Sequence, residues 1–217
     1  SYCRTKCYWV QLKMNRNIYN SNSSNIPDVI FVLLIINALV FALQTLIPGV
    51  FERYLALWPI DTYRDYFSVW QLFSYGFLHG DFYHILFNMF MLWMFGKELA
   101  VIMGAQRFLF YYLTCIMGAG IIQLIIAGTQ GLFYPTIGAS GGVFGLLLAF
   151  GLAFPNRMVM LLFPPIPMKA KYLVILAGIM ELYFGVSGTS PNIANFAHLG
   201  GMLFGFLLLK YWGAVKF

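Results

Sequence analysis

Six apolar stretches, each nearly free of charge, constrain this chain more than any other feature. They cover residues 29–47, 82–95, 108–127, 139–154, 172–186 and 193–211. A helix that crosses the hydrocarbon core of a bilayer needs about 20 mostly apolar residues. Only 9% of the residues are charged, whereas soluble domains carry about a quarter. The sequence therefore predicts an all-α, polytopic membrane protein with six transmembrane helices in one bundle.

The basic residues indicate how this bundle is oriented. If the N-terminus is cytoplasmic, the outer segments hold only Arg53 and Arg64. The inner segments then hold Arg4, Lys6, Lys13, Arg16, Lys97, Arg107, Arg157, Lys169, Lys171, Lys210 and Lys216. An excess of Lys and Arg marks cytoplasmic loops, so we expect both termini in the cytoplasm and the bundle in a cell or inner membrane. The lipid bilayer accounts for the net charge of +6 without a nucleic-acid partner.

Two segments of unequal size follow from the composition. Residues 1–27 are polar and rich in Asn and Ser, which predicts a mobile tail, and the first thirteen need not be native. Residues 28–217 form the six-span domain and leave no room for a second one. Because the first apolar run is long enough to span, we expect no cleaved signal peptide.

The connection between the first two spans, residues 50–81, is long and unusual. It is aromatic throughout, with charged residues interleaved. Aromatic side chains favour the membrane interface, so we expect a long membrane-associated loop, folded as an amphipathic hairpin or as short helices.

The fourth stretch begins with a serine among glycines, Gly138-Ala139-Ser140-Gly141-Gly142. From Gly138 to Phe154 a helix would measure about 25 Å, which is less than a hydrocarbon core of about 30 Å. The serine end therefore starts below the outer surface, where irregular backbone is tolerated only against protein or water. We interpret Ser140 as a nucleophile.

Depth in the bilayer supplies a test of this hypothesis. His84 and Asn88 lie early in the second span, and His198 lies early in the sixth. Even-numbered spans run from outside to inside, so all these groups reach the depth of Ser140. A serine needs a base to take its proton, and His198 is the candidate for a Ser-His dyad. His84 and Asn88 share a helical face and are suited to stabilise an oxyanion.

Small residues offer a way to bring the serine and the base together. Gly141 and Gly145 form a GxxxG pattern in the fourth span, and Gly201 and Gly205 form another in the sixth. Such patterns let membrane helices approach closely. Glu181 is an isolated acid in the fifth span without an evident basic partner, so we favour a structural hydrogen bond over a catalytic role.

Three motifs together resemble the signatures of the rhomboid intramembrane serine proteases. They are Gly138-Ala139-Ser140-Gly141, the stretch from Phe77 to Met89 that contains His79, His84 and Asn88, and Ala197-His198-Leu199-Gly200-Gly201 with Gly205. They occur in the family's order, and the similarity covers residues 47–210. One position departs from the family, because Trp70-Gln71 stands where many members have Trp-Arg.

The resemblance implies cleavage of single-span transmembrane protein substrates by Ser140 and His198, without a cofactor. It implies that His84 and Asn88 form the oxyanion hole, that His79 supports the start of the second span, and that Phe144 packs beside the base. Gly138, Gly141, Gly201 and Gly205 match supporting positions. The fifth span and the turn at 185–194 match a lateral gate and its cap.

Two other functions compete with this interpretation. A six-span transporter or channel would line a polar path with the same histidines, but the two halves show no repeat. A catalytically silent rhomboid-like binder of membrane proteins would not need an intact serine and base. Cys3, Cys7 and Cys115 are too few and too scattered for a metal site or a disulfide. The sequence is silent on oligomeric state.

Overall fold

Six long helices dominate the computed structural model, which describes residues 28–60, 66–160, 165–189 and 194–215. They are α2 (Asp28–Leu46), α5 (Phe82–Met103), α6 (Ala105–Gln130), α7 (Ser140–Ala153), α8 (Ala170–Ser187) and α9 (Asn195–Tyr211). Their order and bounds follow the six predicted stretches closely. The largest difference is at the end of α5, which continues to Met103 and is capped by Gly104 with φ of 78°. The predicted tail, residues 1–27, lies outside the described residues.

Length and hydropathy mark the chain as a mostly helical integral membrane protein. Four of the helices, α2, α5, α6 and α8, are long and apolar enough to cross a membrane. Helix α7 is also apolar but has only 14 residues. The short α7 agrees with the length argument drawn from the sequence.

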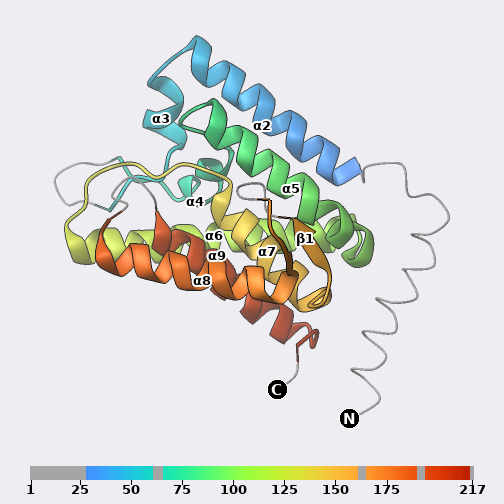
Figure 1. The fold of residues 1–217 in the computed structure, drawn as a ribbon. Coiled ribbons are helices and arrows are strands. Elements are labelled where there is room, and N and C mark those ends of the chain that lie inside the picture. Colours follow the sequence, from blue (N-terminus) through green and yellow to red (C-terminus); the bar gives the residue numbers. More distant parts are fainter. Residues whose placement is uncertain (1–27, 61–65, 161–164, 190–193, 216–217) are drawn as a thin grey trace.

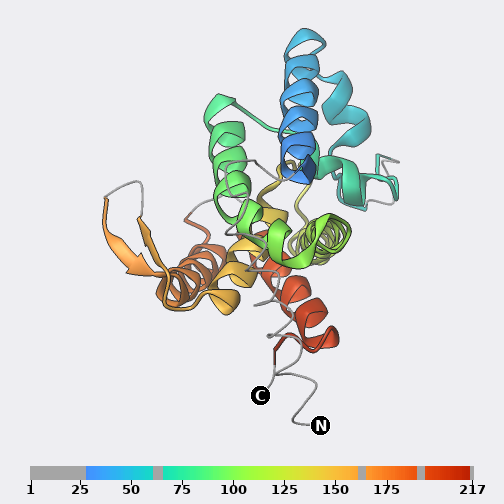
Figure 2. The same cartoon turned by 90° about the vertical axis from the view of Figure 1, so that its right-hand side faces the viewer.

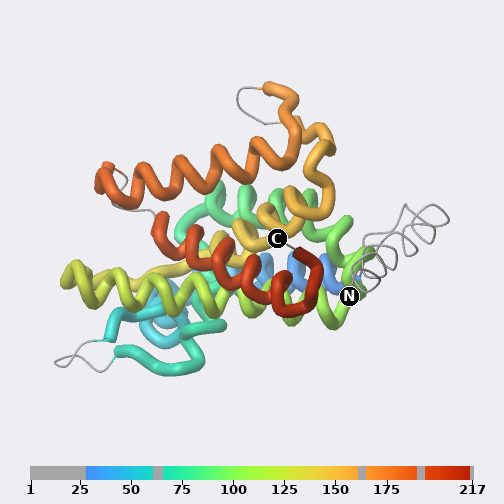
Figure 3. Tube along the Cα trace, turned by 90° about the horizontal axis from the view of Figure 1, so that it is seen from below, coloured from blue at the N-terminus to red at the C-terminus, as the bar shows by residue number. Residues whose placement is uncertain are grey.

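Helices α6, α7 and α9 pack against one another in the middle of the molecule (Figure 1). Helices α2 and α5 run antiparallel along one side, with α5 against α7. Figure 3 shows α8 at one edge of the molecule, beside α9. The two-stranded hairpin of β1 (Met158–Met160) and β2 (Pro167–Lys169) joins α7 to α8 and projects away from the bundle (Figure 2). The site described below lies where α5, α7 and α9 converge.

The loop between α2 and α5 contains three short helices, α3 (Val50–Leu55), α4 (Gln71–Ser74) and the 3-10 helix η1 (Tyr75–Phe77). Gln71, at the position that departs from the family pattern, is buried among them. Its amide donates to the Tyr66 carbonyl over 2.8 Å and accepts from the Trp58 N–H over 3.2 Å. A glutamine offers both a donor and an acceptor, and both are used here to fasten the loop.

This loop also holds the segment that leads into α7. Leu57 and Thr136 exchange two backbone hydrogen bonds of 2.9 Å, and the Gly138 N–H donates to the Tyr75 carbonyl over 2.9 Å. The hydroxyl of Tyr75 donates in turn to the Ile116 carbonyl in α6 over 2.6 Å. The start of α7 is thereby tied to the loop and, through Tyr75, to the middle of the bundle.

Candidate active site

Ser140 is the first residue of α7 and follows a glycine whose backbone no other residue adopts readily. Gly138 has φ of 126°, a region that favours glycine. A Cβ at this position would lie 2.8 Å from Nε2 of His84. The glycine therefore gives the chain its turn and also leaves room for the imidazole beside Ser140.

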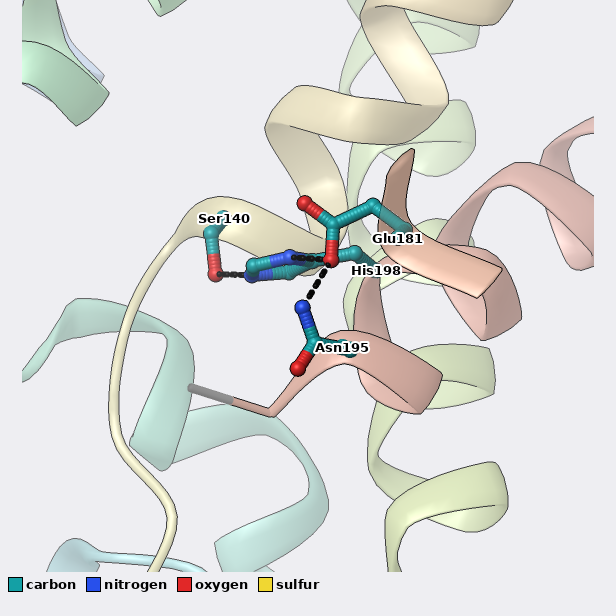
Figure 4. A network of polar contacts seen from close by, with 4 residues as sticks. All are labelled: Ser140, Glu181, Asn195 and His198. Atoms are coloured by element: carbon teal, nitrogen blue, oxygen red, sulfur yellow. Dashed lines mark hydrogen bonds and ion pairs between the residues drawn. The ribbon is translucent and has the colours of Figure 1, made fainter. Parts of the chain in front are cut away.

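His198 faces Ser140 from α9. Its Nε2 lies 2.7 Å from the serine Oγ, a hydrogen-bond distance (Figure 4). The ring of Phe144, one turn after Ser140 in α7, stacks on the His198 ring with centroids 4.3 Å apart and an angle of 4° between the planes. The stacked ring limits the orientations that the imidazole can take.

Glycines let α7 and α9 come this close. A methyl group on Gly201 would overlap the Gly141 carbonyl, and one on Gly145 would lie 3.2 Å from the Gly201 carbonyl oxygen. Gly205 instead abuts the Tyr111 hydroxyl of α6. The two GxxxG patterns thus serve a junction of three helices, and Gly201 is the position where α7 and α9 meet backbone to backbone.

His84 approaches the same point from the start of α5. The Asp81 carboxylate accepts from the His84 backbone N–H over 2.9 Å and caps the helix. The Gly80 N–H donates to Nδ1 of His84 over 3.3 Å. Because Nδ1 accepts, a neutral His84 carries its proton on Nε2. That nitrogen is the one near Gly138, so an N–H donor lies beside the segment that leads into Ser140.

Asn88 lies one turn further along α5 and is almost fully buried. One of its amide N–H groups donates to the His84 carbonyl over 2.9 Å. The amide has a second N–H, and Asn88 lines the same cavity as Ser140 and His198. Asn88 can therefore add a second donor to the one from His84.

His79 lies behind His84. Its backbone exchanges two hydrogen bonds with the Gln44 amide of α2, at 3.1 and 3.3 Å, and its ring stands edge-on to His84 with centroids 5.1 Å apart. Burial, with a smaller contribution from His84, lowers the pKa of His79 from 6.5 to about 4. The ring is thus neutral at pH 7 and supports His84 from behind.

The polar groups open into one cavity of about 840 Å³. Ser140, His198, His84 and Asn88 line it together with apolar side chains of α5 and α7. Within the described ranges, no three His, Cys, Asp or Glu side chains are grouped as metal ligands. A hydroxyl, a base and two N–H donors that converge in a cavity have the parts needed for acyl transfer.

Two further residues join the site that the sequence did not predict there. Oε2 of Glu181 lies 3.0 Å from Nδ1 of His198, and the Asn195 amide donates to the same oxygen over 2.7 Å (Figure 4). The expectation that Glu181 has no basic partner was wrong, because its partner is His198. The depth argument applied to Ser140 could have found Glu181, because the predicted orientation puts this residue in the outer half of the fifth stretch.

Comparisons with known proteins agree on one family. The model of the Rhomboid domain matches residues 66–214. The chain is 31% identical over 186 residues to "Rhomboid protein 1, mitochondrial" of Saccharomyces cerevisiae, covering 83% of this chain and 52% of that protein. It is 28% identical over 186 residues to "Rhomboid protease GlpG" of Yersinia enterocolitica, covering 86% of this chain and 62% of the relative. The chain thus spans between about half and three-fifths of the length of these relatives.

Proposed function

The chain belongs to the rhomboid family, and from this premise we propose that it is an intramembrane serine endopeptidase. In this proposal it cleaves single-span membrane protein substrates in or near the outer half of the bilayer. Ser140 is the nucleophile and His198 is the base. The observation that carries the proposal is the 2.7 Å separation of Ser140 Oγ and His198 Nε2 inside a cavity.

The chemistry follows from this pair. As Ser140 Oγ attacks the scissile carbonyl carbon, Nε2 of His198 takes the hydroxyl proton. The imidazolium then gives that proton to the leaving amine, the carbon–nitrogen bond breaks, and an acyl-enzyme forms. Water, deprotonated by the same nitrogen, attacks the ester, and the proton returns to Ser140 when the acid product leaves.

Three groups are available for the oxyanion that forms at each attack. Nε2–H of His84 and the second N–H of Asn88 line the cavity. The first N–H groups of a helix have no partner within it, so the Ser140 N–H at the start of α7 is a third donor. Gly138, Gly141, Phe144, Gly201, Gly205 and His79 hold these groups in position.

The finer features of the fold belong to the same proposal. We take all six long helices as transmembrane spans, with both termini in the cytoplasm and residues 28–217 as one protease domain. The loop with α3, α4 and η1 then lies in the outer interface, because its exposed aromatic side chains, such as Tyr54 and Trp70, suit that depth.

A Ser140→Ala variant tests the function. Reconstituted with a single-span test substrate, it should show no cleavage above background, while its unfolding temperature in detergent stays close to that of the unchanged protein. A fluorophosphonate should label the unchanged protein at one site, and both Ser140→Ala and His198→Ala should lose the label.

The control is Ser187→Ala, which removes an exposed hydroxyl at the end of α8. It should keep both cleavage and labelling. Cleavage by Ser140→Ala at the original rate would refute the assignment of the nucleophile. A stable protein that neither cleaves nor reacts with the probe would favour the silent binder instead.

A further inference from the structure

Glu181 lies on the face of α8 that is turned toward α9. Gly178 and Gly185, three residues before and four after it, are on the same helical face. A Cβ on Gly178 would lie 3.8 Å from Met202, and a Cβ on Gly185 would lie 3.0 Å from Phe196, both in α9. A Cβ would be tight against α9 at Gly185 and in ordinary contact with it at Gly178. The carboxylate enters the space between these two positions.

One oxygen of this carboxylate meets two groups of α9. Oε2 lies 3.0 Å from Nδ1 of His198 and accepts from the Asn195 amide over 2.7 Å. Asn195 and His198 are three residues apart and share a face of α9. The side chains of Glu181 and His198 are only 14% and 11% exposed. The carboxylate is therefore held on the ring nitrogen that points away from Ser140 (Figure 4).

The reaction needs one tautomer of His198. For Nε2 to take a proton from Ser140, that nitrogen must be free of hydrogen, so the proton of the neutral ring must be on Nδ1. A hydrogen-bond acceptor beside Nδ1 selects this tautomer. Nδ1 is buried, and within the described residues its only polar neighbour is the Glu181 oxygen 3.0 Å away; no hydrogen bond to another group competes for it.

We propose that Glu181 is a positioning residue of this site, which holds His198 in the Nδ1–H tautomer and stabilises the imidazolium that forms when Ser140 attacks. Asn195 assists by fixing which carboxylate oxygen faces the ring. The inference rests on the proposed protease function. It extends the pair of Ser140 and His198 to a row of polar contacts that continues through Glu181 to Asn195. Ser140 and His198 remain the residues that exchange the proton.

The substitution Glu181→Gln tests the role with little change of shape. The amide oxygen can still accept from Asn195, but the negative charge beside the ring is lost. We expect kcat to fall at least about 100-fold, with KM within about threefold because Glu181 does not line the substrate cavity. Asn195→Ala should lower kcat less, by about threefold to tenfold, because the carboxylate remains.

Glu98→Gln is the matched control. Glu98 also pairs with a cation from another part of the chain, at 2.9 Å from Arg157 in the turn after α7, but it lies toward the other end of α5 and outside the cavity. This variant should keep kcat. If Glu181→Gln keeps the original kcat, or if Glu98→Gln loses as much, the positioning role is overturned.

A second measurement needs no substrate. The chain has only three histidines, so nitrogen NMR of protein labelled with ¹⁵N-histidine resolves each ring, and His198→Ala identifies the signal of interest. The proposal requires the Nδ1–H tautomer for His198 at neutral pH in the unchanged protein. The Nε2–H tautomer there overturns it, even if Glu181→Gln proves too unstable for kinetics.

These results separate the two proposals. If Ser140→Ala and His198→Ala still cleave the substrate and take up the probe, the protease assignment fails, whatever Glu181 does. If both lose activity while Glu181→Gln keeps it, only the positioning role fails.

Discussion

Helix α9 meets its two neighbours in the site in different ways. Against α7 it packs backbone to backbone, since a methyl group on Gly201 would overlap the Gly141 carbonyl. Against α8 it packs through side chains, with Met202 at 3.8 Å from a Cβ on Gly178. The best membrane-spanning window of α8 is only 6% buried in the molecule, whereas that of α6 is 44% buried. We call α6, α7 and α9 the tight side and α2, α5 and α8 the loose side.

The difference separates two tasks. The tight side fixes the distance between Ser140 and His198, since neither helix can move without a backbone clash or a gap. The loose side contributes groups that act on this pair: His84 and Asn88 from α5 and Glu181 from α8. Small changes should therefore be costly on the tight side and graded on the loose side.

The largest effect is expected from a pair of glycine-to-alanine substitutions, one on the tight side and one on the loose side. Gly201→Ala forces α7 and α9 apart, because backbone atoms cannot rotate out of the way. We expect a loss of about 3 kcal/mol or more in the free energy of unfolding, together with loss of cleavage. Thermal unfolding in detergent and substrate cleavage measure the two effects.

Gly178→Ala is its counterpart on the loose side. The added methyl meets only a flexible methionine end, and alanine favours a helix over glycine by up to about 1 kcal/mol. Unfolding should stay unchanged or shift upward, with cleavage retained. Similar losses in both variants would remove the distinction between the two sides.

The next largest effect concerns an oxyanion donor on the loose side. Asn88→Ala removes one N–H among several, so kcat should fall about tenfold to a hundredfold. Asn37→Ala in α2 provides the control, because Asn37 makes the same bond to the carbonyl four residues earlier, at 2.8 Å, but lies outside the cavity. Equal effects on unfolding, without a difference in kcat, would mean that Asn88 serves packing alone.

Acid should weaken the junction between α2 and the start of α5 through His79, whose backbone is bonded to Gln44. The pKa of this residue is about 4 in the folded protein and 6.5 ordinarily. Between these values the unfolded chain binds a proton that the folded chain does not, so stability falls as the pH drops below about 6.5. At pH 5 the loss attributable to His79 is about 2 kcal/mol.

Thermal unfolding at pH 7.5 and pH 5 measures this loss. His79→Gln should unfold with a smaller difference between the two pH values, since glutamine does not titrate. An unchanged difference would show that the acid sensitivity arises from other groups.

The smallest effect is expected at Gln71, in the loop that supports the start of α7. Gln71→Ala leaves the partly buried Trp58 N–H and Tyr66 carbonyl without their partner, which should cost about 1 kcal/mol in the free energy of unfolding. Because the bonds from Leu57 and Tyr75 to the segment before α7 persist, kcat should stay within about threefold. Gln130→Ala, at an exposed position of α6, should change neither quantity.

Much of the fold could be predicted because apolar runs are local. The bounds of α2, α7 and α8 differ from the predicted stretches by one or two residues. The agreement is close because each helix coincides with a run of apolar residues, and such a run can be read directly from the sequence. The sequence also predicted that Ser140, His198, His84 and Asn88 share one depth, because each lies early in an even-numbered stretch and such stretches run in the same direction. All four line one cavity of the structure. Their catalytic roles stay predictions.

Contacts across the bundle could not be predicted in the same way. Helices that are apolar nearly all round carry little signal of which face points inward, so the sequence did not indicate that Glu181 faces α9. The role of Gln71 could not be predicted either. The sequence showed only that it departs from the family pattern, whereas the structure shows that its amide fastens the loop with both a donor and an acceptor.

The sequence by itself determined that this chain is a helical membrane protein and which polar groups lie at the same end of their helices, because both depend on the order of residues along each segment. Only the tertiary structure decided that Glu181 and Asn195 join the predicted pair of Ser140 and His198. Contact between Ser140, His198, Glu181 and Asn195 depends on how each helix is rotated about its axis. That rotation is set by small residues on neighbouring helices, where the backbones can approach each other.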